Sequence, residues 1–302
     1  MEVNSKKKIT FAWWNTSLSP HSKENKASEE HKAYVCLTLI KLINQRSVDV
    51  ICLCEVSQGD IDFLTSFFPA SDYSLYDGTV QQGKKKFDLC IIYKTNVLKF
   101  ISSNVISKNQ VSKTLYAGQE VNFLISDTLE PLTLYLVHWS SRLYEHADSP
   151  QKILLGSLLR DAIMSSIEVR EVSNVIVLGD FNDEPFNECL TDALFASRDI
   201  NLVKKTPGLL YNPFWRHMIH SYLHPNALDY QGCGTYYYKG DQSNKWKTVD
   251  QILFSSSFVN GGGWYLNESM TQVFYDEEFI RFIYSSKSKF DHLPIISMIE
   301  RG

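Results

Sequence analysis

Short apolar runs rich in β-branched residues recur along the whole chain, and this recurrence constrains the fold more than any other feature of the sequence. Each run is brief and bounded by polar residues, which is typical of buried strands. The clearest runs are 9–14 (ITFAWW), 48–53 (VDVICL), 87–93 (FDLCIIY), 132–137 (LTLYLV) and 175–178 (VIVL). Further strands are expected at 235–238, 249–254 and 293–299, with one or two edge strands within 97–127.

Helical patterns separate only some of these runs. Helices are expected at about 28–46, 58–68, 150–169, 187–196 and 276–284. Strands therefore outnumber helices roughly two to one, which favours sheets covered by helices and joined by several hairpins. Because no repeat or low-complexity linker interrupts the chain, we expect one domain over 1–302, with a core at about 9–300 and an aromatic-rich insertion at about 204–247.

The overall composition narrows the range of partners. Thirty lysines and arginines stand against 34 acidic residues, a formal charge of −4, which excludes a generally basic nucleic-acid coat but not a local basic groove. The six cysteines form no CxxC pair and are expected to be buried thiols. No apolar run approaches the ~20 residues of a spanning helix, so we expect a cytoplasmic protein without a membrane partner. Its oligomeric state is left open.

Polar residues of catalytic type lie at the ends of these strands: most follow a strand, Asp250 lies within one, and Asp291 and His292 precede the last. Ends of core strands are fixed points, so polar side chains there can converge on one crevice while the strands behind them stay dry. In chain order these residues are Asn15, Glu55, His138, Asp180, Asn182, Asp250, Asp291 and His292.

The order of these residues resembles that of a known family. GDFN at 179–182 and FDHLP at 290–294 are similar to the signatures of the endonuclease/exonuclease/phosphatase superfamily, which has the DNase I-like fold. Six motifs occur in the family's order over about residues 9–300. The resemblance implies an α+β fold, a four-layer α/β/β/α sandwich of two packed sheets flanked by helices. It also implies an enzyme that hydrolyses phosphate esters.

Such hydrolysis needs a hard cation to neutralise the non-bridging oxygens, and Mg²⁺ prefers carboxylate and amide oxygens. Glu55 and Asp291 are the expected metal ligands, with Asn15 contributing an amide oxygen. The expected cofactor is Mg²⁺, with Mn²⁺ as its substitute. Whether one or two metal ions act is left open.

The resemblance also implies roles for the remaining strand-end residues. Asp180 would activate the attacking water, and Asn182 would orient that aspartate or the substrate phosphate. His138 and His292, as protonated imidazoles, would stabilise the charge that develops in the transition state. Asp250 would hydrogen-bond one ring nitrogen of His292 and raise its pKa. Which residue acts as the general acid is left open.

Two further polar residues are secondary candidates. Arg142 lies four residues after His138, where a loop arginine can bind a phosphate through two parallel hydrogen bonds. The alternative for Arg142 is a surface pair with Glu145. Asp88, at the start of the strand at 87–93, could orient His138.

Each strand-end residue also has a structural alternative, which the sequence leaves open. The alternatives are turn roles for Asp180 and Asn15, a solvated strand end for Glu55, a hydrogen-bonded core role for His138, a capping or packing role for His292, and an ion pair between Asp250 and Lys247.

Two departures from the family pattern bear on the substrate. Phe290 stands where the family has serine before Asp-His, and Thr248-Val249-Asp250-Gln251 replaces Arg-Ile-Asp-Tyr. Neither departure removes an expected metal ligand, so activity is still expected. HWSSR at 138–142 and the segment 234–252 resemble an uncharacterised bacterial branch more than the abasic-site repair enzymes.

An aromatic-rich stretch is the main clue to the substrate. Nine aromatic residues lie between Tyr211 and Trp246, interleaved with basic residues. They could stack unpaired bases beside phosphate-binding cations, or form a second core beneath the insertion. Lys84, Lys85 and Lys86 could likewise form a solvated turn or touch a nucleic-acid backbone.

The expected function is therefore a divalent-metal-dependent nuclease with nucleic acid, most readily DNA, as its substrate; whether it acts as an endonuclease or an exonuclease is open. The first alternative is a phosphatase or phosphodiesterase acting on a small phosphoester such as an inositol phosphate. The second is a catalytically silent binding module of the same fold, against which the intact set of strand-end residues argues.

Overall fold

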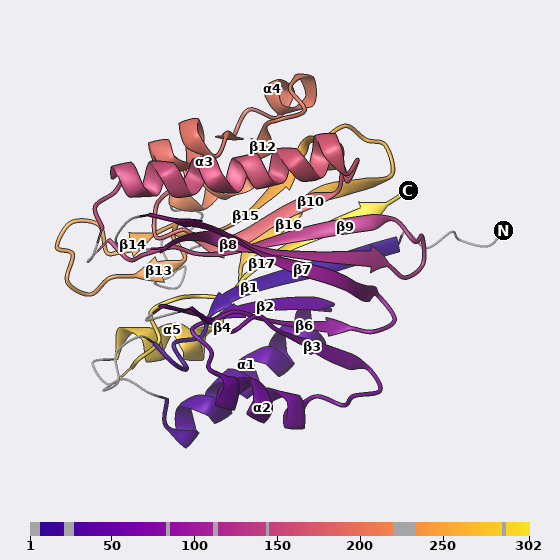
Figure 1. Cartoon of the computed structure of the whole chain (residues 1–302). Helices are drawn as coiled ribbons and strands as arrows, with labels where there is room; N and C mark the ends of the chain where they lie inside the picture. Colours follow the sequence, from indigo (N-terminus) through magenta and orange to yellow (C-terminus); the bar gives the residue numbers. More distant parts are fainter. Residues whose placement is uncertain are drawn as a thin grey trace.

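The computed structural model describes residues 7–20, 27–82, 85–110, 114–142, 145–219, 233–285 and 288–302. Two β-sheets lie face to face in the middle of the molecule, and helices cover the outer surface of both (Figure 1). This arrangement confirms the expected four-layer α/β/β/α sandwich and the α+β class.

The first sheet brings the N-terminal strand between two partners. In spatial order its strands are β16 (Trp264–Val273), β17 (Ile295–Arg301), β1 (Lys7–Asn15), β2 (Val50–Cys54), β6 (Cys90–Lys94) and β3 (Tyr73–Asp77). β1 is parallel to β2 and antiparallel to β17. The carboxyl ends of β1 and β2 therefore meet the beginning of β17 at one end of the sandwich.

The second sheet has a similar arrangement of parallel and antiparallel strands. In spatial order its strands are β11 (Ala196–Ser197), β12 (Leu210–Tyr211), β15 (Asp250–Ser255), β10 (Val175–Asp180), β9 (Pro131–His138), β8 (Thr114–Ile125) and β7 (Leu98–Asn109). β10 is parallel to β9 and antiparallel to β15. The ends of β9 and β10 therefore lie beside the beginning of β15. Two short ribbons complete the strands, β4 (Val80–Gln82) with β5 (Lys85–Phe87) and β13 (Tyr236–Tyr237) with β14 (Trp246–Lys247).

Serine caps mark where the main helices begin. Ser28, Ser57 and Ser149 each accept a backbone N–H from the first turn, which satisfies a donor that the helix itself leaves unpaired. Figure 1 shows which helices cover which sheet. On the first sheet lie α1 (Glu29–Arg46), α2 (Gln58–Phe67) and α5 (Glu277–Tyr284); on the second lie α3 (Pro150–Met164) and α4 (Ile200–Lys205).

Four shorter helical turns connect these elements. They are the π-helical η2 (Ser165–Val169) and η3 (Cys189–Ala193), and the 3₁₀-helical η4 (Pro213–Met218) and η5 (Ser256–Phe258). Among the described residues, no helix is both long and apolar enough to span a bilayer.

Several expected elements have different limits in the structure. The run at 87–93 is broken, because Asp88 and Leu89 leave the ladder between β5 and β6. The helix expected at 150–169 becomes π-helical at its end, where the Ser166 hydroxyl bonds that of Tyr135. The helix expected at 187–196 shortens to the π-helical turn η3.

Two strand expectations also change. The stretch 97–127 forms a long hairpin in which only β7 is an edge, since β8 pairs with both β7 and β9. β16 was not expected, because polar residues interrupt its apolar pattern and its pairing with β17 shifts register between Asn267 and Gln272. Within the aromatic-rich stretch, residues 220–232 lie outside the described part of the chain.

Candidate active site

Six strand ends from both sheets converge at one end of the sandwich. In the second sheet Asp180, the last residue of β10, pairs in register with His138 on one side and Asp250 on the other. The first sheet reaches across to the same point, where Asn15 Nδ2 donates to Asp180 Oδ2 at 3.2 Å and Trp13 Nε1 donates to Asp250 Oδ1 at 3.0 Å. The topology thus brings together residues far apart in the sequence.

Asp180 occupies the centre of this convergence and is almost completely buried. Its Oδ1 accepts the backbone N–H of Asn182 at 2.9 Å. Its Oδ2 lies 4.0 Å from His138 Nε2 and 3.8 Å from His292 Nε2. The carboxylate is therefore held by its own loop on one side and faces two imidazole nitrogens on the other.

Each of the two histidines has its own carboxylate partner. His138 Nδ1 lies 2.9 Å from Asp88 Oδ1, and His292 Nδ1 lies 2.7 Å from Asp250 Oδ2. The hydrogen bond expected between Asp250 and His292 is thus present, and Lys247 pairs instead with Asp241. Because Nδ1 is occupied in both rings, Nε2 is the nitrogen left to face Asp180.

The carboxylate partners determine the charge of these imidazoles. Burial by itself would lower the pKa of His138, but Asp88, with Asp180 and Glu55 beyond it, raises that pKa to about 10. Burial likewise opposes protonation of His292, and Asp250 and Asp180 raise its pKa well above the usual value. Both rings are therefore imidazolium ions at neutral pH in the protein alone.

Glu55 and Asp291 differ from the other carboxylates in having few partners. Among the described residues, none donates a hydrogen bond to the Glu55 carboxylate. Within the described part of the chain, the Asp291 side chain accepts only the Ser17 hydroxyl, at 3.4 Å, and it lies 3.9 Å from His292 Nε2. Burial, with the charges of Asp88 and Asp291, raises the pKa of Glu55 to about 7.

This donor set fits a hard divalent cation. Glu55 and Asp291 are two partly exposed carboxylates with unused lone pairs, and such carboxylates are the ligands that Mg²⁺ or Mn²⁺ takes. Asn15 lies beside them, and its amide oxygen accepts the Ser17 N–H at 3.2 Å, which leaves one lone pair unused.

A second group of potential ligands lies deeper in the same site. Among the described residues, Asp180, Asp250 and His292 place ligand atoms within 4.8 Å of one another. However, Asp250 already accepts from Trp13, from the Thr235 hydroxyl and from His292 Nδ1. These three bonds occupy most of the roughly four lone-pair sites of a carboxylate, so this group suits a hydrogen-bonded relay better than a coordination shell.

Backbone geometry fixes two of the site residues. Glu55 and Asn182 have φ angles of +57° and +52°, a left-handed conformation that costs a non-glycine residue about 1–2 kcal/mol. Asn182 is held by its N–H to Asp180 and by Nδ2 to the Trp139 carbonyl at 3.0 Å. The glycine of GDFN is needed because a Cβ on Gly179 would lie 2.5 Å from the Val137 carbonyl oxygen.

Arg142 lies behind this loop and anchors it. Its Nε lies 3.0 Å from Asp183 Oδ1 and 3.1 Å from the Asn182 carbonyl, and Nη2 donates to Asn187 Oδ1 at 2.7 Å. Two faces of the guanidinium are therefore already bound to the protein. The phosphate-binding role expected for Arg142 remains a proposal. Its contacts with the described residues leave the Nη1 hydrogens and one Nη2 hydrogen for a substrate.

Lys152 is a supporting residue that sequence reasoning missed. This lysine is completely buried in the first turn of α3 and donates to the Phe181 carbonyl at 3.0 Å. Its Nζ also pairs with Asp183 Oδ2 at 3.0 Å. The sequence signal was weak, because a lysine two residues after a helix-starting proline is usually a solvated side chain.

Phe290, which replaces the family's serine, has a packing role. It is buried, and its ring lies 3.8 Å from that of His31 and 5.9 Å from that of Trp14, measured between centroids. It therefore fixes the segment that carries Asp291 against α1 by aromatic contact instead of a hydroxyl hydrogen bond.

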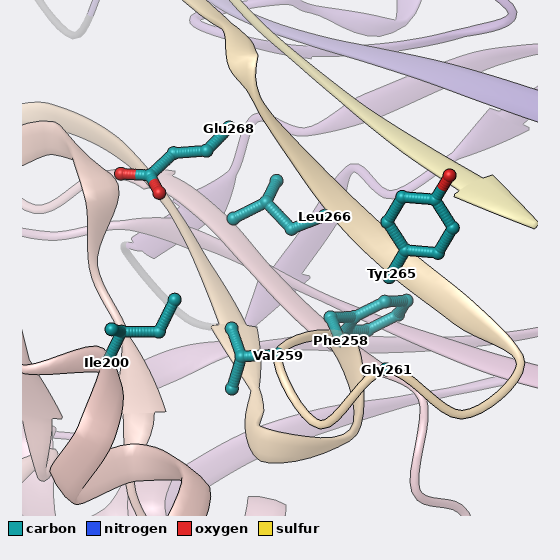
Figure 2. A pocket seen from close by; sticks show the side chains of 7 residues that line it. All are labelled: Ile200, Phe258, Val259, Gly261, Tyr265, Leu266 and Glu268. Carbon is teal, nitrogen blue, oxygen red and sulfur yellow. The ribbon is translucent and has the colours of Figure 1, made fainter.

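A separate hollow of about 200 Å³ lies beside β16 and η5, away from these strand ends (Figure 2). Its walls are largely apolar, with Ile200, Val259 and Leu266 among them. The one carboxylate in its lining, Glu268, is already bound by the Tyr211 hydroxyl and by Arg216. This hollow therefore lacks the free polar groups that the strand-end site provides.

A family model described as "Endonuclease/Exonuclease/phosphatase family" matches residues 16–294. No curated protein matches the sequence. Among solved structures, an endonuclease/exonuclease/phosphatase family protein from Bacteroides thetaiotaomicron is 14% identical with a TM-score of 0.65, covering 98% of this chain and 96% of its own.

Two other similar structures differ in their printed functions. The human nocturnin catalytic domain with a bound sulfate anion is 16% identical with a TM-score of 0.61, and 98% of each chain is covered. A mannosyl-6-phosphatase from Bacteroides thetaiotaomicron is 14% identical with a TM-score of 0.62, covering 96% of this chain and 99% of its own. At these identities the likeness shows a shared fold and leaves the substrate to the site itself.

Proposed function

The chain belongs to the endonuclease/exonuclease/phosphatase family, whose members are phosphoester hydrolases, and from this premise we propose a divalent-metal-dependent phosphodiesterase that cleaves DNA. The observation that carries the proposal is the pair Glu55 and Asp291, two nearly unpartnered carboxylates beside two imidazoles that have carboxylate partners of their own. Hydrolysis of a phosphate ester needs cationic groups on the phosphate oxygens and a base for water, and this arrangement supplies both.

Glu55 and Asp291 would hold the metal ion, with the Asn15 amide oxygen as a third ligand. When bound, Mg²⁺ or Mn²⁺ neutralises charge on the phosphate oxygens and favours departure of the leaving oxygen. The remaining roles fall to groups of the protein.

Asp180 is the base in this proposal. Asn15 and the Asn182 N–H fix its carboxylate, so it can accept a proton from a water aimed at phosphorus without changing its rotamer. His138 and His292, held protonated by Asp88 and Asp250, would offer Nε2–H to the phosphate oxygens as charge develops on them. Either imidazolium could then supply the proton for the leaving group.

The cations around the site favour a diester with one negative charge. Arg142 and Lys152 are bound to Asp183, and Lys247 is bound to Asp241. A substrate with several phosphate groups, such as an inositol polyphosphate, would need additional unpaired cations in the site. A nucleic-acid backbone presents one charge per phosphate and meets this condition.

The test compares four substrates with and without metal. Purified protein is incubated with Mg²⁺ or Mn²⁺ and with plasmid, single-stranded DNA, RNA or inositol phosphates. We expect cleavage of DNA that EDTA abolishes. Release of inorganic phosphate from inositol phosphates with intact DNA would replace the proposal by the small-phosphoester alternative, and no turnover of any substrate would favour a binding module.

Thermal unfolding tests the metal ligands separately. Metal at a hundred times its dissociation constant should stabilise the wild type by about 2.7 kcal/mol. Glu55→Gln and Asp291→Asn should lose both activity and this stabilisation. Asp180→Asn should lose activity but keep the stabilisation, since Asp180 is not a proposed ligand; equal stabilisation of all four proteins would overturn the ligand assignment.

We also propose the cytoplasm as the compartment of the protein. This proposal rests on the sequence, and cell fractionation tests it.

A further inference from the structure

A row of aromatic rings leads outward from His292. The Tyr236 ring lies 4.5 Å from the His292 ring, with 33° between their planes. The Tyr238 ring continues the row, 6.3 Å from Tyr236 and nearly parallel to it at 17°. Alternate residues of a strand share one face, which explains why both rings lie on the same side while Tyr237 packs on Trp246 and Tyr284.

The backbone fixes this row relative to the site. The Tyr237 N–H donates to the Asp291 carbonyl at 2.7 Å, and the Leu293 N–H donates to the Thr235 carbonyl at 2.7 Å. Tyr236 therefore forms a β-bridge with His292 itself. The rings cannot shift along the strand without moving the segment that carries Asp291 and His292.

The outermost ring is both held and accessible. A Cβ on Gly240 would lie 3.0 Å from the Tyr238 ring, so the ring packs closely against the backbone there. Tyr238 is nevertheless 36% exposed, whereas Tyr236 is half-buried beneath it. An exposed aromatic face whose ring is fixed in place loses little entropy when a planar ligand stacks on it.

A cation accompanies the exposed ring. The Tyr238 N–H donates to the Lys245 carbonyl at 2.7 Å, so Lys245 is the residue opposite Tyr238 in the ribbon. The Lys245 side chain is exposed and has no ion-pair partner among the described residues. An aromatic face beside a free ammonium is the arrangement that binds single-stranded nucleic acid.

We propose that Tyr238, supported by Tyr236 and flanked by Lys245, stacks an unpaired nucleobase next to the phosphate held at His292, and so selects single-stranded nucleic acid. This inference rests on the proposed function and sharpens its substrate class. Base pairs in a duplex cover both faces of each base, so a stacking platform of this kind favours unpaired substrate.

Kinetics with matched oligonucleotides test the proposal. The readout is the ratio of kcat/KM for a single-stranded oligonucleotide to kcat/KM for the same strand with abasic sites around the scissile phosphate. Stacking of one base contributes about 1–3 kcal/mol, so Tyr238→Ala should reduce this ratio roughly tenfold or more. Tyr238→Phe should preserve it, because stacking needs the ring and not the hydroxyl.

Two further variants separate stacking from other effects. Lys245→Gln should weaken binding of both strands equally, because phosphate contacts do not depend on the base. Phe100→Ala removes a comparably exposed ring, 38% accessible, from edge strand β7 and should leave the ratio unchanged. If Tyr238→Ala behaves like Phe100→Ala, the platform is overturned.

Binding measurements keep the two proposals distinguishable. Fluorescence anisotropy of a labelled single-stranded oligonucleotide, recorded without metal, needs no turnover. Tighter binding of the base-bearing strand, lost in Tyr238→Ala, supports the platform even if no phosphodiester is hydrolysed. Equal binding of base-bearing and abasic strands by the wild type overturns the platform while leaving the proposed hydrolysis intact.

Discussion

Acidic residues have opposite surroundings at the two ends of the sandwich, the end that carries the candidate active site (the site end) and the opposite end (the far end). At the far end, Glu130 precedes β9 and binds Arg301 at the end of β17, together with the Trp264 indole N–H at 2.8 Å. In the middle of the second sheet, where Glu120 on β8 pairs with Tyr135 on β9, Glu120 likewise binds Arg170. At the site end, Glu55 and Asp291 meet no lysine or arginine among the described residues that could neutralise them.

This difference separates stability from function within one fold. A carboxylate paired with a guanidinium contributes to folding. At the site the carboxylates outnumber the two imidazolium ions beside them, so they repel one another and oppose folding. Such a cluster persists where a bound cation, absent from the unfolded chain, offsets the repulsion. The acidic side chains of the far end therefore have a structural role. The charge arrangement of the site end is not needed for folding and indicates a functional role.

The strongest test of this contrast neutralises one carboxylate at each end. Asp180→Asn should reduce kcat by about 10²–10⁴, because the proposed base is removed while its shape is retained. Its free energy of unfolding, measured by urea denaturation in EDTA, should stay unchanged or rise, since negative charge is lost from an acidic cluster.

Glu130→Gln is the matched variant at the far end. It should lower the free energy of unfolding by about 1–2 kcal/mol, because a charge-assisted hydrogen bond to Arg301 becomes a neutral one. Its kcat on the same substrate should equal that of the wild type. A fall in activity at the far end, or a fall in stability at the site end, would break the contrast.

The buried pair Lys152–Asp183 has a structural role but lies next to the site. Both side chains are completely buried just behind the Asp180–Asn182 loop. Lys152→Met should lower the free energy of unfolding by about 3–5 kcal/mol, because it leaves the Asp183 charge without its lysine partner. The double variant Lys152→Met/Asp183→Asn should recover part of this loss in the same denaturation experiment.

An exposed lysine supplies the control for this measurement. Lys32 pairs with Glu29 across one helical turn, and Lys32→Met should change the free energy of unfolding by less than about 0.5 kcal/mol. If the double variant is no more stable than Lys152→Met alone, loss of the buried charge partner is not the cause.

The residues of the site were easier to predict from the sequence than the buried residues that hold them in place. Glu55 and Asp180 lie at the carboxyl ends of strands with clear apolar runs, and His292 lies just before such a strand. The direction of each strand therefore predicts that these residues converge. Lys152 could not be found in this way, because its burial depends on how α3 lies over the second sheet. A lysine in a first helical turn gives no sign of a buried partner 31 residues away in Asp183.

The same limit applies to the strands. β2 and β10 were predictable because both of their faces are buried, which requires unbroken apolar runs. β16 was missed because its residues are half-buried and its bulge breaks the alternation. The two-residue period of a strand puts Tyr236 and Tyr238 on one face. It takes the bridge between Tyr236 and His292 to show that this face lies at the site.

Two buried histidines, one at the site and one outside it, should respond differently to pH. His138 has Asp88 as a partner, whereas His31 stacks on Phe290 and its Nε2 has no hydrogen-bond partner among the described residues. Burial lowers the pKa of His31 to about 4. Between pH 6.5 and 4 the unfolded chain therefore binds a proton that the folded chain does not, so acid destabilises the protein through this residue.

The expected difference is on the order of 2 kcal/mol at pH 5 relative to pH 7. His31→Gln should remove that part of the acid sensitivity, which urea denaturation of both proteins at the two pH values measures. An identical loss in wild type and variant would show that His31 does not carry the linkage.

The smallest expected effect lies within the far end itself. Lys7 and Asp127 are 3.4 Å apart but 49% and 63% exposed, whereas Arg301 and Glu130 are about one-third exposed and share the Trp264 N–H. Solvent screens the first pair, so Lys7→Ala should change the free energy of unfolding by less than about 0.5 kcal/mol. Arg301→Ala should cost about 1–2 kcal/mol in the same titration, because it leaves a partly buried carboxylate without its cation. If both variants lose the same stability, partial burial does not determine how much an ion pair contributes to folding. The ion pairs of the far end could then not serve as the structural comparison for the carboxylates of the site.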